Sequence, residues 1–181
     1  MEKYIFIISG KARHGKTTVA NYIKDYYEDK GKKLIITEFS KYIKMYARDI
    51  LSWDGLEETK PRKFLQDLGN DLRDIDNSYL VSRILDDIDV YEDYSDGVAI
   101  DDARLSYEID YMRFYKKKRV KVLNVIRPDF DNGLSLEEKE DITERELDDY
   151  KNYDYTIMNN GSLDELRSKV TSILEGLDIW N

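Results

Sequence analysis

One stretch of this sequence has residue types and spacing suited to binding phosphate. Residues 10 to 17 follow the pattern G-x-x-x-x-G-K-[ST], and they read Gly10-Lys11-Ala12-Arg13-His14-Gly15-Lys16-Thr17. In this pattern the glycines allow successive backbone N–H groups to point at phosphate oxygens, and the lysine reaches the β- and γ-phosphates. The threonine hydroxyl is a ligand for Mg²⁺. We therefore predict that this loop, together with Thr18, binds a nucleotide triphosphate with Mg²⁺.

The segments around the loop support this interpretation. An apolar run over residues 4–8 is typical of a buried strand. After the loop, apolar residues recur at helical spacing on one face, at Val19, Tyr22, Ile23, Tyr26 and Tyr27. A helix N-terminus adds partial positive charge to a strand–loop–helix unit, which favours anions. His14, the only histidine, stands at a variable position of the pattern, so we expect a solvent-facing spacer and no histidine-based triad.

Composition narrows the class of protein. The chain has 181 residues, enough for one domain over residues 1–181 with its own core. It has no cysteine, no apolar run long enough to span a membrane and no signal peptide, so we expect a cytoplasmic protein without a membrane partner. The formal net charge of -9 argues against a nucleic-acid partner. Composition leaves both a monomer and a homodimer possible.

The pattern along the chain predicts alternating strands and helices. We expect strands near 4–8, 33–39, 97–101, 119–126 and 154–158, and helices near 16–29, 41–51, 61–75, 78–89, 106–116, 143–150 and 162–177. Capping boxes are expected at Thr143 with Glu146 and at Ser162 with Glu165. This order predicts an α/β fold of three layers, the P-loop NTPase fold, with a five-stranded parallel sheet.

Ligands in such sheets bind beyond the carboxyl ends of the strands. The third strand ends in Asp101-Asp102, and Arg104 follows. We expect Asp102 to be the partner of Mg²⁺ and Arg104 to bind a phosphate, with a solvated turn and a surface ion pair as the alternatives. Arg127 ends the fourth strand and is expected to point toward the ligand.

The predicted helix at 61–75 has two contrasting sides. Phe64, Leu65, Leu68, Leu72 and Ile75 form an apolar side, and Arg62, Gln66, Gly69 and Arg73 form the opposite one. Because a helix rises by about 1.5 Å per residue, the two arginines lie about 16 Å apart along the axis and cannot share one phosphate. We expect one arginine to bind a substrate phosphate and Gln66 to bind a base or sugar; a solvated helix face is the alternative.

Residues 128–141 form a long connection that is rich in carboxylates. Loops above about 12 residues tend to be functional or disordered. We expect a lid over the donor phosphates that is open or mobile without ligand and closes with help from Arg127 and Arg145. A solvated acidic loop is the alternative.

Several classes of P-loop protein are excluded. The D-x-x-G and N-K-x-D sequences expected of a switch GTPase are absent, and a helicase or an AAA-type motor needs a longer chain. A small-molecule or nucleotide kinase fits the length, the early loop and the lid-like segment.

Further segments resemble the phage-type deoxynucleoside monophosphate kinases, nearly end to end and in the same order. They are Phe39-Ser40 with Lys44, Arg62 to Gly69 with Asp71 and Arg73, Ile100 to Arg104 with Glu108, Val125 to Pro128, Thr143-Glu144 and Ile157 to Leu166. Two positions depart from the family's pattern: Asp141 replaces a histidine, and Leu105-Ser106-Tyr107 replaces an aromatic residue, proline and asparagine.

The resemblance implies a nucleoside monophosphate kinase fold, with Mg·ATP as donor and a (deoxy)nucleoside monophosphate as acceptor. It implies that Lys16 and Thr17 serve ATP and metal, that Asp102 and Arg104 serve the acceptor side, and that Arg127 serves the transferring phosphoryl group. The acceptor would bind in a helical part at about 40–95, at Ser40, Lys44, Arg62, Gln66 and Arg73. The alternatives are a kinase for dephospho-coenzyme A or phosphomevalonate, and a non-catalytic ATP-binding protein.

Overall fold

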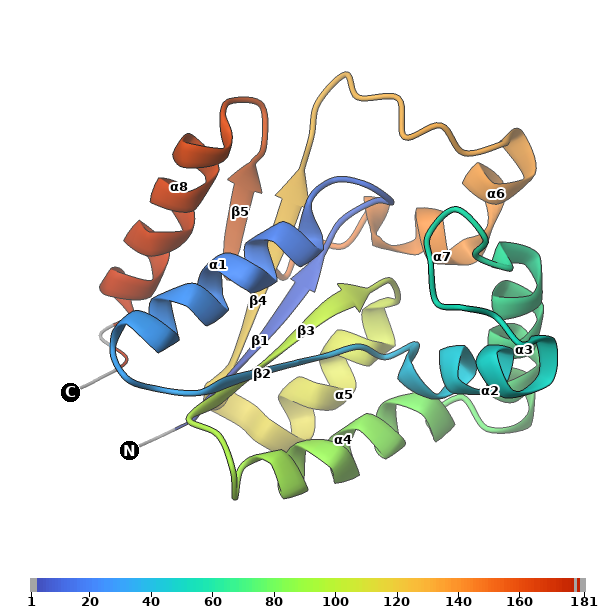
Figure 1. Ribbon diagram of the computed structural model, residues 1–181, viewed down its shortest axis with the longest axis horizontal. Coiled ribbons are helices and arrows are strands. Elements are labelled where there is room, and N and C mark those ends of the chain that lie inside the picture. The colour runs from blue at the N-terminus through green and yellow to red at the C-terminus, as the bar shows by residue number, and fades with distance from the viewer. Residues whose placement is uncertain (1–2, 178, 180–181) are drawn as a thin grey trace.

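Five parallel strands form the centre of the fold, in the order β2-β3-β1-β4-β5 (Figure 1). A computed structural model describes residues 3–177 and 179, so the ends of the predicted domain, 1–2, 178 and 180–181, lie outside the described residues. The strands are β1 (Tyr4–Ser9), β2 (Leu34–Thr37), β3 (Gly97–Ala103), β4 (Val120–Ile126) and β5 (Tyr155–Met158). The predicted α/β fold with a five-stranded parallel sheet is confirmed.

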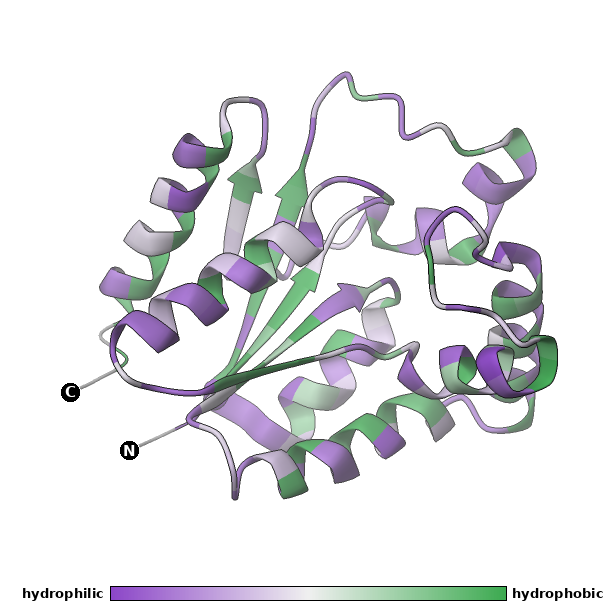
Figure 2. Ribbon diagram, viewed as in Figure 1, coloured by the Kyte–Doolittle hydropathy of each residue, from purple (hydrophilic) through white to green (hydrophobic). Residues whose placement is uncertain are grey.

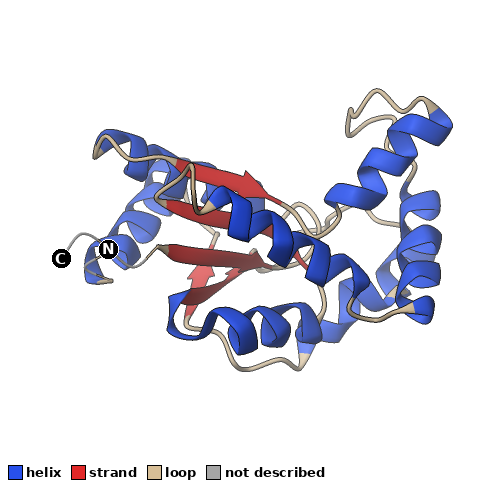
Figure 3. Ribbon diagram, turned by 90° about the horizontal axis from the view of Figure 1, so that it is seen from below, coloured by secondary structure: helices blue, strands red, loops and turns tan. Residues whose placement is uncertain are grey.

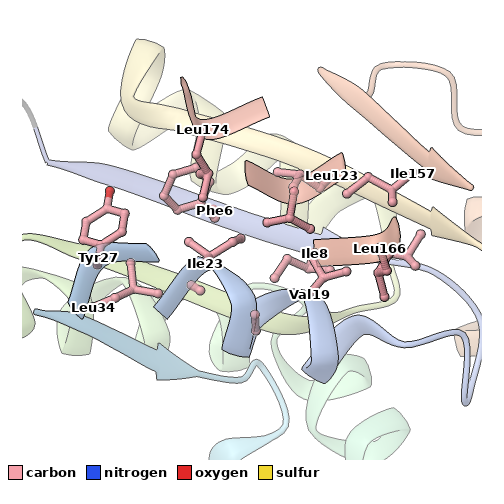
Figure 4. Packing of buried hydrophobic residues seen from close by; sticks show 14 of the residues in the cluster. Phe6, Ile8, Val19, Ile23, Tyr27, Leu34, Leu123, Ile157, Leu166 and Leu174 are labelled. Atoms are coloured by element: carbon pink, nitrogen blue, oxygen red, sulfur yellow. The ribbon is translucent and has the colours of Figure 1, made fainter. Parts of the chain in front are cut away.

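Helices cover both faces of the sheet because the central strand β1 is apolar on both sides. Phe6 and Ile8 pack under α1 (Lys16–Asp29) and α8 (Leu163–Gly176), as Figure 4 shows. Ile5 and Ile7 point to the opposite face, where α4 (Tyr79–Tyr91) and α5 (Ser106–Lys116) pack. Figure 2 shows the apolar sides of these helices turned toward the sheet. This alternation follows from the two-residue period of a strand.

A third apolar cluster lies beyond the sheet and holds the helical part together. It contains Ile43 and Ala47 of α2 (Lys41–Leu51), Leu65 of α3 (Arg62–Ile75) and Leu80 of α4. Figure 3 shows α2 and α3 at the end of the molecule away from the N-terminus. Ile75, the last residue on the predicted apolar side of α3, is 83% exposed because it stands at the last turn of the helix, past the cluster.

The segment after β4 differs most from the sequence-based prediction. Residues 128–141 contain a short helix, α6 (Leu136–Glu140), and the single helix predicted at 143–150 is instead α7 (Ile142–Arg145) followed by the 3-10 turn η2 (Glu146–Asp148). Asp141 caps α7, because its side chain accepts from Thr143 N at 2.9 Å; the predicted capping box at Thr143 is therefore wrong. The box at Ser162 and Glu165 is confirmed.

Of the helices in residues 3–177, none has the length and apolar character needed to cross a membrane. A second 3-10 turn, η1 (Lys117–Arg119), leads into β4.

Candidate active site

The phosphate-binding loop joins β1 to α1, and its two glycines are required by the backbone. Gly10 has φ 140° and a Cβ there would collide with the carbonyl oxygen of Val125. Gly15 has φ 101° and a Cβ there would lie 2.7 Å from Nδ2 of Asn159, which donates to the His14 carbonyl at 2.9 Å. Strand β4 and the loop after β5 therefore hold the loop from both sides, and only glycine fits these contacts.

Lys16 lies inside the loop it belongs to. Its ammonium donates to the carbonyls of Gly10 at 2.7 Å and Lys11 at 2.9 Å, and the residue is only 8% exposed. Burial, with the nearby Arg104 guanidinium as the second cause, lowers the pKa of Lys16 to about 7. A buried ammonium that donates to carbonyl oxygens would gain a directly bound anion when a phosphate binds.

Other residues of the loop reach outward to neighbouring segments. The Lys11 ammonium donates to Asp148 at 3.0 Å, and Arg13 donates to the carbonyl of Asn132 at 2.8 Å. Thr18 lies in the first turn of α1. These contacts tie the loop to the segment that follows β4.

His14 is buried, so the prediction of a solvent-facing spacer is wrong. Its Nδ1 accepts from Arg127 N at 3.2 Å, and its ring stands edge-on to Phe130 at 6.3 Å between centroids. Burial is the largest cause that lowers the pKa of His14. Composition could not indicate this position, because the groups that bury the imidazole come from the end of β4, more than a hundred residues away in the chain.

Asp101, rather than Asp102, faces the loop threonine. The Thr17 hydroxyl donates to Asp101 Oδ2 at 2.6 Å. Asp102 Oδ1 accepts from Phe39 N at 2.7 Å, and Asp102 Oδ2 accepts from Ser40 N at 3.0 Å. Both oxygens of Asp102 thus hold the turn before α2, whereas Asp101 is the carboxylate beside Thr17; which of the two binds the metal stays a prediction. Successive residues of a strand point to opposite faces, and this separates the two carboxylates.

Thr17 and Asp101 fit Mg²⁺ by chemistry. A hydroxyl and a carboxylate are hard oxygen donors, and Mg²⁺ in phosphate sites is typically held by one or two carboxylates together with substrate phosphates. Burial and the neighbouring Asp102 raise the pKa of Asp101, as expected for a carboxylate that would gain from a cation.

A cavity beyond the end of β3 brings together all the residues predicted to bind an acceptor. We call it the acceptor cavity; among the residues that line it are Ser40, Lys44, Arg62, Gln66, Arg73, Asp102 and Arg104. Its apolar wall consists of Phe39, Ile43, Leu65, Leu80 and Leu134. The polar side of α3 therefore faces this cavity, although Arg62 and Arg73 stand eleven positions apart on the helix.

Glu108 fixes the position of Arg104 at this cavity. It is 5% exposed, and its Oε2 accepts from Arg104 N at 2.9 Å and Leu105 N at 3.1 Å, which caps α5. Burial raises the pKa of Glu108 to about 8, although the two N–H donors oppose this effect. The carboxyl group holds the turn between β3 and α5 from inside.

A second cavity lies against the phosphate-binding loop, and we call it the loop cavity. Gly10, Lys11 and His14 line it, and it shares Arg104, Thr143 and Glu144 with the acceptor cavity. The Arg104 guanidinium is paired with Glu144 Oε1, and Glu144 Oε2 accepts from Ala12 N at 3.2 Å. The two cavities therefore meet at the ion pair of Arg104 and Glu144.

Part of the segment 128–141 lies against the acceptor cavity, while most of its residues are exposed. Leu134 and Glu138 line the acceptor cavity, and Glu138 lies 3.7 Å from Arg62 of α3. The expectation that the segment is open or mobile without ligand stays a prediction. Arg13 and Arg62 offset the charge of this acidic segment, and neither is close to it in the sequence.

Arg127 and Arg145, predicted to help the lid close, lie elsewhere. The Arg127 guanidinium stacks on Phe130, 3.8 Å from the ring centroid, and lines neither of the two cavities. Arg145 is paired with Glu140 at the surface. The structure therefore does not bring Arg127 to the residues around Lys16 and Arg104, because Phe130 offers its guanidinium a flat partner within the same turn.

Sequence reasoning assigned no role to Asp101, Glu108, Glu144 or Asn159. All four belong to segments that carried the family resemblance, and Asp101 was indicated also by its place at the end of the third strand. Their contacts join residues far apart in the chain, such as the 145 positions between His14 and Asn159.

Comparison with known proteins identifies a family. The family model described as deoxynucleotide monophosphate kinase matches residues 26–170. The match begins after the phosphate-binding loop, so the loop and the family match are separate observations. None of the curated proteins matches the chain.

Solved structures show the same fold at low identity. TT1252 from Thermus thermophilus is 17% identical, with 98% of this chain and 99% of that chain covered and a TM-score of 0.57. The Mycobacterium tuberculosis APS kinase CysC in complex with AMPPNP and APS is 16% identical, with 96% and 98% covered and a TM-score of 0.52. A sugar kinase from Janibacter is 13% identical, with 96% and 95% covered and a TM-score of 0.51.

Proposed function

This chain belongs to the deoxynucleotide monophosphate kinase family and is an ATP-dependent nucleotide kinase, and we propose that its acceptor is a (deoxy)nucleoside monophosphate bound in the acceptor cavity. The family match supports a nucleoside monophosphate as the acceptor over dephospho-coenzyme A or phosphomevalonate, and supports catalysis over ATP binding alone. The product is the corresponding diphosphate.

The observation that carries the proposal is the meeting of the two cavities at Arg104. This residue lines both, so a phosphate on its guanidinium would stand between the loop and the helical part. The acceptor base would then lie against the apolar wall of the cavity, with Gln66 at its edge or at the sugar. Apolar walls with a few convergent polar groups are typical of small-molecule sites.

In the proposed reaction an oxygen of the acceptor phosphate attacks the γ-phosphorus of ATP. The new O–P bond forms as the bond from the γ-phosphorus to the β–γ bridging oxygen breaks, and ADP leaves with the bonding electron pair. Lys16 and the loop N–H groups hold the donor phosphates, and Arg104 holds the acceptor phosphate. Mg²⁺, held by Thr17 and Asp101, would neutralise charge on the donor phosphates.

The segment 128–141 is proposed as the lid of this reaction. Leu134 already contributes to the wall of the acceptor cavity, and Arg13 and Arg62 hold the segment at two points. A seated lid would exclude water and so favour transfer to the acceptor over hydrolysis. Arg127 could serve the transferring phosphoryl group only after leaving Phe130.

The proposal places the reaction in the cytoplasm, with nucleotides as partners and neither nucleic acid nor membrane. Light scattering would measure whether the protein forms a homodimer.

A panel of acceptors tests the proposal. The protein is incubated with ATP, Mg²⁺ and each ribo- and deoxyribonucleoside monophosphate, and formation of ADP and of the acceptor diphosphate is followed. We expect turnover with at least one nucleoside monophosphate, and none with dephospho-coenzyme A or phosphomevalonate. Turnover with only a non-nucleotide acceptor would overturn the proposal.

A further inference from the structure

Glu144 occupies a position that matches the chemistry of a phosphate group. One carboxylate oxygen accepts from Ala12 N of the phosphate-binding loop at 3.2 Å, and the other is paired with the Arg104 guanidinium. Loop N–H groups and arginines are the donors that phosphate oxygens use in nucleotide sites. The Glu144 side chain is only 8% exposed, so the contact is enclosed and not a surface ion pair.

We propose that Glu144 is a gate between the donor and acceptor sites, a carboxylate that holds Ala12 N and Arg104 until substrate phosphates displace it. The inference rests on the proposed function in one respect, because it takes these two donors to be phosphate ligands. It goes beyond that function by assigning a role to a residue that binds no substrate.

The placement of Glu144 gives this gate a mechanical basis. It lies in the single turn of α7, whose start is fixed by the Asp141 side chain accepting from Thr143 N at 2.9 Å. Asp141 ends the segment 128–141, so displacement of Glu144 shifts α7 and the end of the lid together. Phosphate binding is thereby coupled to lid movement.

The gate also has an electrostatic consequence. Glu144 places a negative charge where nucleotide phosphates must go, so the carboxylate competes with them for the same donors. With no phosphates bound, Glu144 neutralises Arg104 at the point where the two cavities meet. A neutral side chain of the same shape removes the competing charge while it retains an oxygen that can accept from Ala12 N.

The test compares Glu144→Gln with wild type by equilibrium binding of inorganic tripolyphosphate and of a non-hydrolysable ATP analogue. We expect both to bind about fivefold or more tightly to the variant, because one like charge close to the ligand is removed. Glu28→Gln is the matched control: Glu28 lies in the last turn of α1, its side chain is 58% exposed and it pairs with Lys24, so binding is expected to stay unchanged.

The direction of the change decides the outcome. Weaker or unchanged binding to Glu144→Gln, with the thermal unfolding temperature of wild type, would overturn the gate, because Glu144 would then be a fixed brace for Arg104. The binding measurement needs no acceptor, so its result is independent of the turnover measured with the acceptor panel. If Glu144→Gln does not fold, Glu144→Asp is measured instead, because its shorter carboxylate reaches the two donors less well. Tighter phosphate binding to this variant supports the gate, and weaker or unchanged binding overturns it.

Discussion

The phosphate-binding loop and the acceptor cavity are built in opposite ways. The loop uses backbone groups that are consecutive in the sequence, and its shape depends on Gly10 and Gly15 at positive φ. The acceptor cavity uses side chains from α2, α3, the end of β3 and residues 134–144. A ligand on the loop would thus depend on one short segment, whereas a ligand in the cavity depends on the packing of several distant ones. Substitutions should separate the two regions.

The largest expected effect is at the loop. Lys16→Ala should lower kcat by about 100-fold or more, because it removes a preorganised cation at the transferring phosphate. The fold should stay intact, since burial of this ammonium lowers its pKa to about 7 and so makes the lysine a cost to stability. Steady-state kinetics and thermal unfolding measure the two effects.

Lys24→Ala on the same helix is the control, because its ammonium pairs with Glu28 at the surface. If Lys16→Ala turns over as fast as wild type, the loop is not the donor site.

Substitution of Asp101 should affect catalysis, whereas substitution of its neighbour Asp102 should affect stability. Asp101→Asn should reduce turnover by about 100-fold and raise the Mg²⁺ concentration needed for half-maximal rate, since it removes the carboxylate beside Thr17. Asp102→Asn should instead lower the free energy of unfolding by about 1–2 kcal/mol, because one of its two backbone contacts loses its acceptor. Kinetics at varied Mg²⁺ concentration and unfolding in urea measure the two effects. If Asp102 is the metal ligand, Asp102→Asn and not Asp101→Asn will raise the Mg²⁺ concentration needed for half-maximal rate.

A smaller effect is expected in the acceptor cavity. Gln66→Ala should raise the KM for the acceptor by about tenfold and leave the KM for ATP unchanged, as loss of one or two hydrogen bonds predicts. Asp67→Ala, next to it on the exposed side of α3, should change neither value. Equal changes in both KM values would mean that the phosphate-binding loop and the acceptor cavity are not separate binding sites.

The smallest effect concerns His14 and pH. Its folded pKa lies below its ordinary value of 6.5, so the unfolded chain binds the proton first as the pH falls. The His14 contribution is therefore complete above pH 6.5 and is lost as the pH falls toward the folded pKa. Unfolding temperatures at pH 7.5 and 5.5 measure this. His14→Gln, which cannot titrate, should show a smaller decrease; an identical decrease would remove His14 as its source.

The same contrast explains what the sequence could and could not predict. The loop, the sheet and the helices α1, α2, α3 and α5 follow from local patterns, because each depends on residues near one another in the chain. The helix predicted at 143–150 failed, since Asp141 and the contacts of Glu144 determine where α7 begins and what it faces. The burial of His14, and the contact of Thr17 with Asp101 rather than Asp102, depend on partners far away in the sequence.

The central claim is that the phosphate-binding loop and the acceptor cavity are the donor and acceptor sites of one reaction, joined at Arg104. It is tested most directly by calorimetric binding of a bisubstrate analogue, in which adenosine and the best acceptor nucleoside are linked through a chain of phosphates. We predict that the analogue binds about 100-fold more tightly than either ATP or the acceptor alone, because the second site is filled without a further loss of free motion. Binding no tighter than that of ATP alone would show that the acceptor cavity does not continue the donor site, and would contradict the account.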